Sequence, residues 1–244
     1  MTMLSTEGLN KKFGGLHAVR DVSFSVSAGE ILGLIGPNGA GKTTVFGLLS
    51  GFIRHDAGKV RLGGEPIDSW SPEARCEAGL VRTFQIVRPF GNITVLENVA
   101  IGAMLRTTSR AQARRDAAEV LERVGLADRA QEIARGLPIG IRKRLEVAKA
   151  LATRPKVMLL DEIMGGLIPT EVNEMMGLLR QLRTDGAAVV LIEHNMHAVM
   201  TVSDRVVVLN HGAKIAEGTA EQVSKDSAVI SAYLGEDYDS AQDH

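Results

Sequence analysis

The feature that most constrains this chain is a glycine-rich octapeptide at residues 36–43. It reads Gly-Pro-Asn-Gly-Ala-Gly-Lys-Thr and fits the pattern G-x-x-x-x-G-K-[ST]. The glycines of such a loop let successive backbone N–H groups turn inward around a polyphosphate. The lysine reaches the outer phosphates, and the threonine hydroxyl can bind Mg²⁺. The octapeptide therefore predicts a site for a nucleoside triphosphate with Mg²⁺.

The sequence on either side of the octapeptide fits this interpretation. A continuous apolar run at residues 31–35 precedes it, as expected of a central strand that is buried on both faces. Apolar residues between 45 and 49 indicate a following helix, whose positive dipole end would point at the phosphates. The residues predicted to bind the phosphates are Gly36, Pro37, Asn38, Gly39, Ala40, Gly41, Lys42, Thr43 and Thr44.

Strand and helix patterns alternate along the rest of the chain. The patterns predict strands at 22–26, 157–160 and 187–192, hairpins at 59–67 and 205–217, and helices at 170–184 and 193–202. Such alternation implies an α/β fold with a mostly parallel sheet covered on both sides. The helical stretch at 95–152 is too long for one crossover and indicates an inserted α-helical subdomain. The final ten residues are polar and predict a loose tail.

Composition excludes several classes of protein. The chain has 244 residues, and its net charge of -1 gives no overall attraction to nucleic acid or to anionic membranes. Cys76 is the only cysteine, so an internal disulfide and a cysteine-rich zinc site are excluded. The N-terminus lacks the pattern of a signal peptide, and no window reaches the ~18 to 20 apolar residues that cross a bilayer. We therefore expect a soluble, cytoplasmic protein whose membrane role, if any, comes through a partner.

Two acidic residues and a histidine follow buried strands. Asp161 and Glu162 end the strand at 157–160, and His194 follows the strand at 187–192. Parallel α/β sheets bind ligands at the carboxyl ends of their strands, so Asp161 is predicted to face Lys42 and Thr43 and to hold Mg²⁺ through water. Glu162 is predicted to polarise the attacking water, and His194 to contact the γ-phosphate or to orient that water.

Read together, these residues resemble the ATP-binding subunits of ABC transporters, from about residue 4 to residue 235. The resemblance implies a single domain, 1–244, with a P-loop NTPase (RecA-like) core and an antiparallel β subdomain at 1–88 and 153–244, and a helical subdomain at 89–152. It places Phe13 against adenine, with Val19 as a further ATP contact, and Gln85 on Mg²⁺ and on the loop that touches the membrane subunits. The amino-acid sequences of the short segments 82–85, 94–98, 192–196 and 232–236 are similar to those of branched-chain amino acid importers.

Two segments depart from the family pattern. The signature loop, usually Leu-Ser-Gly-Gly-Gln, is here Leu137, Pro138, Ile139, Gly140 and Ile141, and Ile168 replaces the usual Asp or Asn of the D-loop. In ABC dimers each ATP lies between one chain's phosphate-binding loop and the other chain's signature. The signature of this chain is weakened, because Pro138 brings neither a hydroxyl nor an N–H. A heterodimer with a better-matched partner would then have one strong site.

Other functions stay open at this point. Residues 97–154 hold 12 basic and 7 acidic side chains. Because positive and negative residues are interspersed, a solvated surface is favoured over a nucleic-acid face, and Arg142, Lys143 and Arg144 are predicted to form a surface patch.

A non-transport ABC ATPase and a regulatory subunit with weak turnover remain alternatives to an importer subunit. The resemblance implies ATP and Mg²⁺, a second ATPase subunit, permease subunits and, indirectly, a periplasmic binding protein. It places the chain on the inner face of the cell membrane. Other amino acids, amides or urea are alternative solutes.

Overall fold

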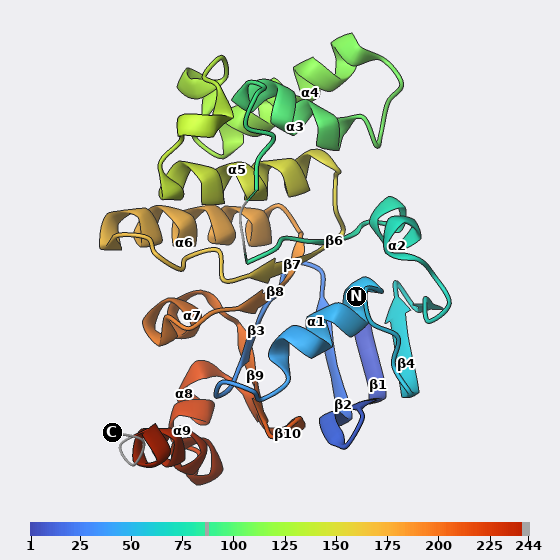
Figure 1. Ribbon diagram of the computed structural model, residues 1–244, viewed down its shortest axis with the longest axis vertical. Helices are drawn as coiled ribbons and strands as arrows, with labels where there is room; N and C mark the ends of the chain where they lie inside the picture. Colours follow the sequence, from blue (N-terminus) through green and yellow to red (C-terminus); the bar gives the residue numbers. More distant parts are fainter. Residues whose placement is uncertain (86–87, 241–244) are drawn as a thin grey trace.

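One sheet runs through the computed structural model, which describes residues 1–85 and 88–240. Within these residues the strand order is β5-β4-β1-β2-β10-β9-β3-β8-β7-β6 (Figure 1). The strands are β1 (Thr2–Phe13), β2 (Leu16–Ser27), β3 (Ile31–Ile35), β4 (Ala57–Leu62), β5 (Glu65–Pro66), β6 (Leu80–Arg82), β7 (Val157–Asp161), β8 (Ala188–Ile192), β9 (Arg205–Asn210) and β10 (Ala213–Gly218).

The sheet has a parallel half and an antiparallel half. Strands β9, β3, β8, β7 and β6 pair in parallel, whereas β1, β2, β4 and β5 pair antiparallel and β10 returns antiparallel to β9. Met158 and Leu160 of β7 pack into one hydrophobic cluster, and Val157 and Leu159 pack into another. Burial on both faces explains why β7 reads as a continuous apolar run. The predicted α/β class with an antiparallel β part is confirmed.

Helices cover the parallel half of the sheet. The helices of the described residues are α1 (Lys42–Ser50), α2 (Pro72–Ala78), α3 (Val95–Ala103), α4 (Arg110–Arg123), α5 (Ile139–Ala152), α6 (Pro169–Thr184), α7 (Met196–Val202), α8 (Ala220–Ser224) and α9 (Ser227–Ser240), with 3-10 turns η1 (Ala127–Arg129) and η2 (Ala134–Gly136). Figure 1 shows α3, α4 and α5 at one end of the molecule and α8 and α9 at the other. One buried cluster joins α3, α4 and α5 to α6 and the sheet. The division at residues 89 and 152 stays a prediction.

The predicted loose tail is wrong for most of its length. Helix α9 continues through Ser240, and residues 241–244 lie outside the described part of the chain. The start of α9 explains this result, because Val229 is buried and Tyr233 packs against the core. Once its first turns are fixed by packing, a helix extends into polar residues at little further cost.

Asn98 fastens the start of α3 to the segment before it. The side chain is fully buried, accepts a hydrogen bond from the Phe90 N–H at 2.8 Å, and donates to the carbonyl oxygens of Phe90 and Thr94 at 3.1 and 2.9 Å. We expect Asn98→Ala to lower the free energy of unfolding by about 2–4 kcal/mol, because it removes three hydrogen bonds of a fully buried side chain and leaves a cavity in its place. Urea denaturation measures the loss, with the exposed Asn92→Ala as control. A loss equal to that of the control would contradict this account.

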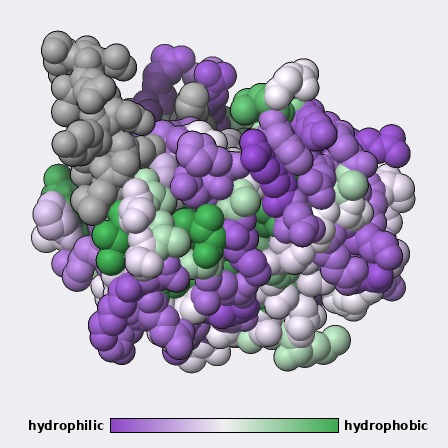
Figure 2. Space-filling model, turned by 90° about the horizontal axis from the view of Figure 1, so that it is seen from below, coloured by the Kyte–Doolittle hydropathy of each residue, from purple (hydrophilic) through white to green (hydrophobic). Residues whose placement is uncertain are grey.

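One face of the described surface is largely polar. Figure 2 shows a face on which hydrophilic side chains predominate and hydrophobic ones gather in small clusters. Among the described residues, the helices are all too short or too polar to span a bilayer.

Candidate functional site

A cleft of about 490 Å³ gathers most of the predicted site residues. It lies where the loop before α1 meets the β1–β2 turn and the segments that follow β7 and β8. Predicted residues that line it are Phe13, Asn38, Gly39, Ala40, Gly41, Lys42, Thr43, Thr44, Gln85, Glu162 and His194. The cleft is also lined by Leu16, His17, Ala18, Arg20, His211 and Gly212. Residues far apart in the sequence thus meet at one place, as the sheet-edge argument predicted.

The loop at 36–43 depends on two glycines that no other residue could replace without strain. Gly36 has φ 147°, and a Cβ there would lie 2.1 Å from the Leu209 carbonyl oxygen. Gly41, which precedes α1, has φ 100°, and a Cβ there would lie 2.5 Å from the Ala18 carbonyl oxygen. Side chains at these positions would push the loop away from β9 and β2. The glycine spacing therefore sets the backbone path of the loop.

Lys42 is folded back over this loop. Its side chain is buried, and its Nζ donates to the carbonyl oxygens of Gly36 at 2.5 Å and of Pro37 at 2.8 Å. The ammonium charge is therefore held inside the curve of the loop, at the base of the cleft. An anion that enters the cleft meets this charge and the positive end of the α1 dipole together.

The Glu162 carboxylate is held from two sides. Gln85 Nε2 donates to its Oε2 at 2.6 Å, and His194 Nε2 lies 2.8 Å from its Oε1. The Glu162 side chain is 21% exposed, so it reaches the cleft without being freely solvated. Three residues that the sequence selected separately thus form one hydrogen-bonded group. A carboxylate in this position can accept a proton from a water molecule in the cleft.

Asp161 has a partner that the sequence did not reveal. Its carboxylate accepts a hydrogen bond from Arg82 at 2.9 Å, is only 3% exposed, and does not line the cleft. Its backbone N–H donates to the Thr83 hydroxyl at 3.1 Å. The structure thus places Arg82 of the neighbouring strand against the carboxylate that was predicted to face Lys42 and Thr43.

The remaining predicted residues lie outside the lining of this cleft. Val19 is fully buried in the core, and its neighbour Ala18 lines the cleft in its place. Leu137 and Gly140 are buried, Ile139 is 38% exposed, and Pro138 caps α5 without a side-chain hydrogen bond. Ile141 packs against the core at the same end of α5. The segment 137–141 thus contributes nothing to this chain's own cleft.

The predicted surface patch at 142–144 is wrong for Lys143, which is only 6% exposed. Its Nζ donates to the Glu162 carbonyl oxygen at 2.5 Å and to that of Gln85 at 3.4 Å. Burial holds the pKa of Lys143 below its ordinary value, although the charges of Glu193, Glu162 and Asp161 oppose this effect. Burial likewise raises the pKa of Glu193, which is 3% exposed. In the sequence Lys143 stands between two arginines, so spacing alone does not identify it.

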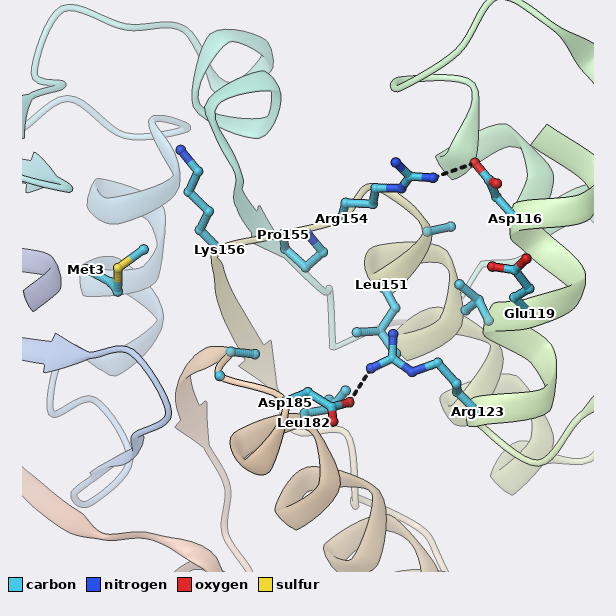
Figure 3. Close-up of a pocket in the computed structure, with 14 residues that line it drawn as sticks. Met3, Asp116, Glu119, Arg123, Leu151, Arg154, Pro155, Lys156, Leu182 and Asp185 are labelled. Carbon is cyan, nitrogen blue, oxygen red and sulfur yellow. Dashed lines mark hydrogen bonds and ion pairs between the residues drawn. The ribbon is translucent and has the colours of Figure 1, made fainter. Parts of the chain in front are cut away.

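A larger cleft, about 730 Å³, lies elsewhere in the described residues. Figure 3 shows it between α4, the end of α5 and the end of α6, with Arg154 pointing to Asp116 and Arg123 pointing to Asp185. In each of these ion pairs the two charges neutralise each other. No glycine-rich loop is among the described residues that line this cleft. The smaller cleft has the backbone donors and the lysine that a polyphosphate requires. We therefore assign the candidate site to the smaller cleft.

A parallel sheet, a glycine loop between β3 and a helix, and carboxylates at the end of β7 in the same sheet define a P-loop ATPase. An ABC transporter family model matches residues 19–165, and a model of the branched-chain amino acid ATP-binding cassette transporter matches residues 213–239. The chain belongs to the ATP-binding cassette family of ABC transporters and is an ATPase of that type.

Relatives of known function cover nearly the whole chain. The chain is 40% identical to the high-affinity branched-chain amino acid transport ATP-binding proteins BraF of Pseudomonas aeruginosa and LivG of Escherichia coli, over 96% of this chain and 98% of theirs. It is 34% identical to the lipopolysaccharide export system ATP-binding protein LptB of Escherichia coli, over 98% of this chain and 99% of that protein. A crystal structure of an ABC transporter ATP-binding cassette in its ADP conformation has a TM-score of 0.88 and 31% identity, over 96% of this chain and 99% of that one.

Proposed function

We propose that this chain hydrolyses Mg–ATP to drive the import of branched-chain or related amino acids through a membrane permease. The observation that carries the proposal is the hydrogen-bonded group of Gln85, Glu162 and His194 at the cleft that also contains the glycine loop. A binding module with no chemistry needs the loop but gains nothing from a carboxylate held in this way. Hydrolysis needs both, because phosphoryl transfer depends on positioning and on charge stabilisation.

The cleft residues divide naturally between the parts of ATP. Backbone N–H groups of the loop 36–43 and the Lys42 ammonium would bind the phosphates. Phe13 is 46% exposed at the rim of the cleft, where its ring can stack on adenine. On binding, Lys42 would exchange the carbonyl oxygens of its own loop for phosphate oxygens. Because the Lys42 ammonium already lies against the loop that lines the cleft, it needs only a short movement to reach the phosphate oxygens.

The donors near the phosphates fit Mg²⁺, which prefers oxygen ligands and keeps several waters. The Thr43 hydroxyl and the Gln85 amide oxygen line the cleft and would bind the ion directly. Asp161 would act through water, because Arg82 already occupies its carboxylate. Bound Mg²⁺ would neutralise charge on the phosphates. Each of the three residues offers an oxygen atom, so the set suits this ion better than zinc.

Glu162 and His194 would carry the chemistry. The Glu162 carboxylate would accept a hydrogen bond from the attacking water and direct it at the γ-phosphorus, in line with the leaving oxygen. His194 would orient that carboxylate or contact the γ-phosphate. Lys42 and the loop N–H groups would stabilise the charge that develops on the phosphate oxygens.

The partners follow from surfaces outside the cleft. The weakened segment 137–141 would face ATP in the site of a second ATPase subunit, which favours a heterodimer with one strong site. An apolar groove of about 430 Å³ beside Gln85 would receive the permease. Phe52 and Phe84 line this groove and contact each other edge to face, with ring centroids 5.6 Å apart. Phe52 is 59% exposed and Phe84 is 50% exposed. Exposed aromatic pairs of this kind mark protein contacts. A periplasmic binding protein would act on the permease.

Relatives support import but leave a rival, since the chain is also similar to an exporter subunit. The match of residues 213–239 to the branched-chain model favours import.

In cells that lack this chain's gene, we expect uptake of radiolabelled leucine to be lost and to return with the wild-type chain. Phe52→Ser should keep ATPase activity and fail to restore uptake. Isoleucine and valine should compete, while urea and simple amides should not. Leucine uptake unchanged by deletion would contradict the proposed solute class.

A further inference from the structure

Lys143 behaves differently from the basic residues beside it. On α5 the neighbouring Arg144 is paired with Glu174 on the exposed side of α6. Lys143 instead points inward, and its only hydrogen bonds that the described residues show are to main-chain oxygens of Glu162 and Gln85. Burying an ammonium costs free energy unless it makes strong hydrogen bonds. A lysine at this place therefore does something that an apolar side chain of the same length could not do.

The backbone that Lys143 contacts is strained. Glu162 has φ 49°, the left-handed region that a residue with a side chain rarely adopts. Such a residue costs of order 1–3 kcal/mol and persists only where its surroundings hold it. Its N–H donates to the Ile192 carbonyl oxygen at 2.9 Å, and its carbonyl accepts from Lys143 at 2.5 Å. These backbone angles decide where the Glu162 carboxylate points.

A second buried charge holds the same turn from the other side. Glu193 accepts a hydrogen bond from the Met164 N–H at 2.5 Å and is 3% exposed. Lys143 thus fixes the carbonyl of Glu162, while Glu193 fixes an N–H two residues later. Both charges act on main-chain atoms, and among the described residues neither side chain is hydrogen-bonded to the Glu162 carboxylate itself. The carboxylate is left to Gln85 and His194.

We infer that Lys143 is a positioning residue, which holds the Glu162 backbone in the conformation that presents its carboxylate to the cleft. The inference rests on the proposed role of Glu162 in hydrolysis. Lys143 does not touch the reacting atoms. Its effect passes through the Glu162 carbonyl, so it belongs to turnover and not to nucleotide affinity.

The test uses three variants of the full chain. Lys143→Met keeps most of the length of the side chain and removes the charge, and Lys143→Arg keeps the charge. Lys149→Met is the matched control on the same helix, since Lys149 bonds to Glu146 within α5. Lys143→Met should lower kcat by about 10- to 100-fold, because small misplacements of a catalytic group cost this much. Its Kd for a fluorescent ATP analogue should change less than about twofold, by the same separation of binding from turnover.

Rescue and non-additivity complete the test. Lys143→Arg should recover part of the lost kcat, and Lys149→Met should match the wild type. Added to Glu162→Gln, Lys143→Met should cause no further loss, because residues that act as a unit are not additive. Normal kcat in Lys143→Met, an equal loss of kcat and affinity, or a further loss in the double variant would overturn the inference. If Lys143→Met does not fold, Lys143→Gln is judged by the same criteria. If Glu162→Gln alone leaves kcat unchanged, the proposed role of Glu162 fails first, whereas a folded wild-type chain that does not hydrolyse Mg–ATP would refute the proposed function.

Discussion

Replacing Glu162 by glutamine should slow ATP hydrolysis by about 10²-fold or more, the range that general-base catalysis contributes. Glutamine keeps the size of the side chain and can still bond to Gln85 and His194. It cannot take a proton from water at neutral pH. ATP binding should persist, because in the proposed site the loop 36–43, and not Glu162, binds the phosphates. Steady-state phosphate release and a nucleotide titration measure the two quantities separately.

The control for this change is Glu174→Gln on α6, which removes an exposed carboxylate that pairs with Arg144. It should leave turnover unchanged. Exposed pairs of this kind contribute about 0–1 kcal/mol to stability, so folding should also be unaffected. Near-normal turnover in Glu162→Gln would show that another residue activates the water. His194 is then the first residue to examine, because it lies 2.8 Å from the same carboxylate.

The sequence predicts those parts of the site that are contiguous or that follow a buried strand. The loop 36–43 is one continuous segment, and its amino-acid sequence reflects backbone constraints that the structure shows at Gly36 and Gly41. Glu162 and His194 are found because each follows an apolar run that can only be a central strand. Parallel pairing of β7 with β8 then brings them together, with Asp161 opposite Ile192.

The sequence does not predict which charges turn inward. Lys143 lies between two arginines, and a run of cations normally indicates a solvated face. Its burial depends on the angle at which α5 meets the turn after β7, which is a property of tertiary packing. Arg82 is similar, because its pairing with Asp161 follows from β6 lying beside β7. Each of these cations turns inward because an oxygen atom on another element accepts its hydrogen bond: the Glu162 carbonyl for Lys143 and the Asp161 carboxylate for Arg82. The sequence alone does not reveal such a partner.

Replacing Lys42 by alanine should weaken ATP binding by about 10²-fold or more, or close to 3 kcal/mol, as expected when a charged hydrogen-bond donor is lost from a buried site. The ammonium is 7% exposed and has no other cation of the loop to replace it among residues 36–43. The change also removes the donor that bridges the carbonyl oxygens of Gly36 and Pro37. Titration calorimetry with Mg–ATP measures the affinity.

Two comparisons separate loss of binding from loss of structure. Lys225→Ala removes an exposed lysine of the same charge and should bind ATP as the wild type does. A melting temperature for Lys42→Ala close to that of the wild type would show that the loop alone has lost its ligand. Because the Lys42 charge lies inside the curve of the loop that is proposed to bind the phosphates, any well-folded Lys42→Ala chain with unchanged affinity would mean that ATP binds elsewhere. The hydrogen-bonded group at Glu162 would then have no substrate to act on.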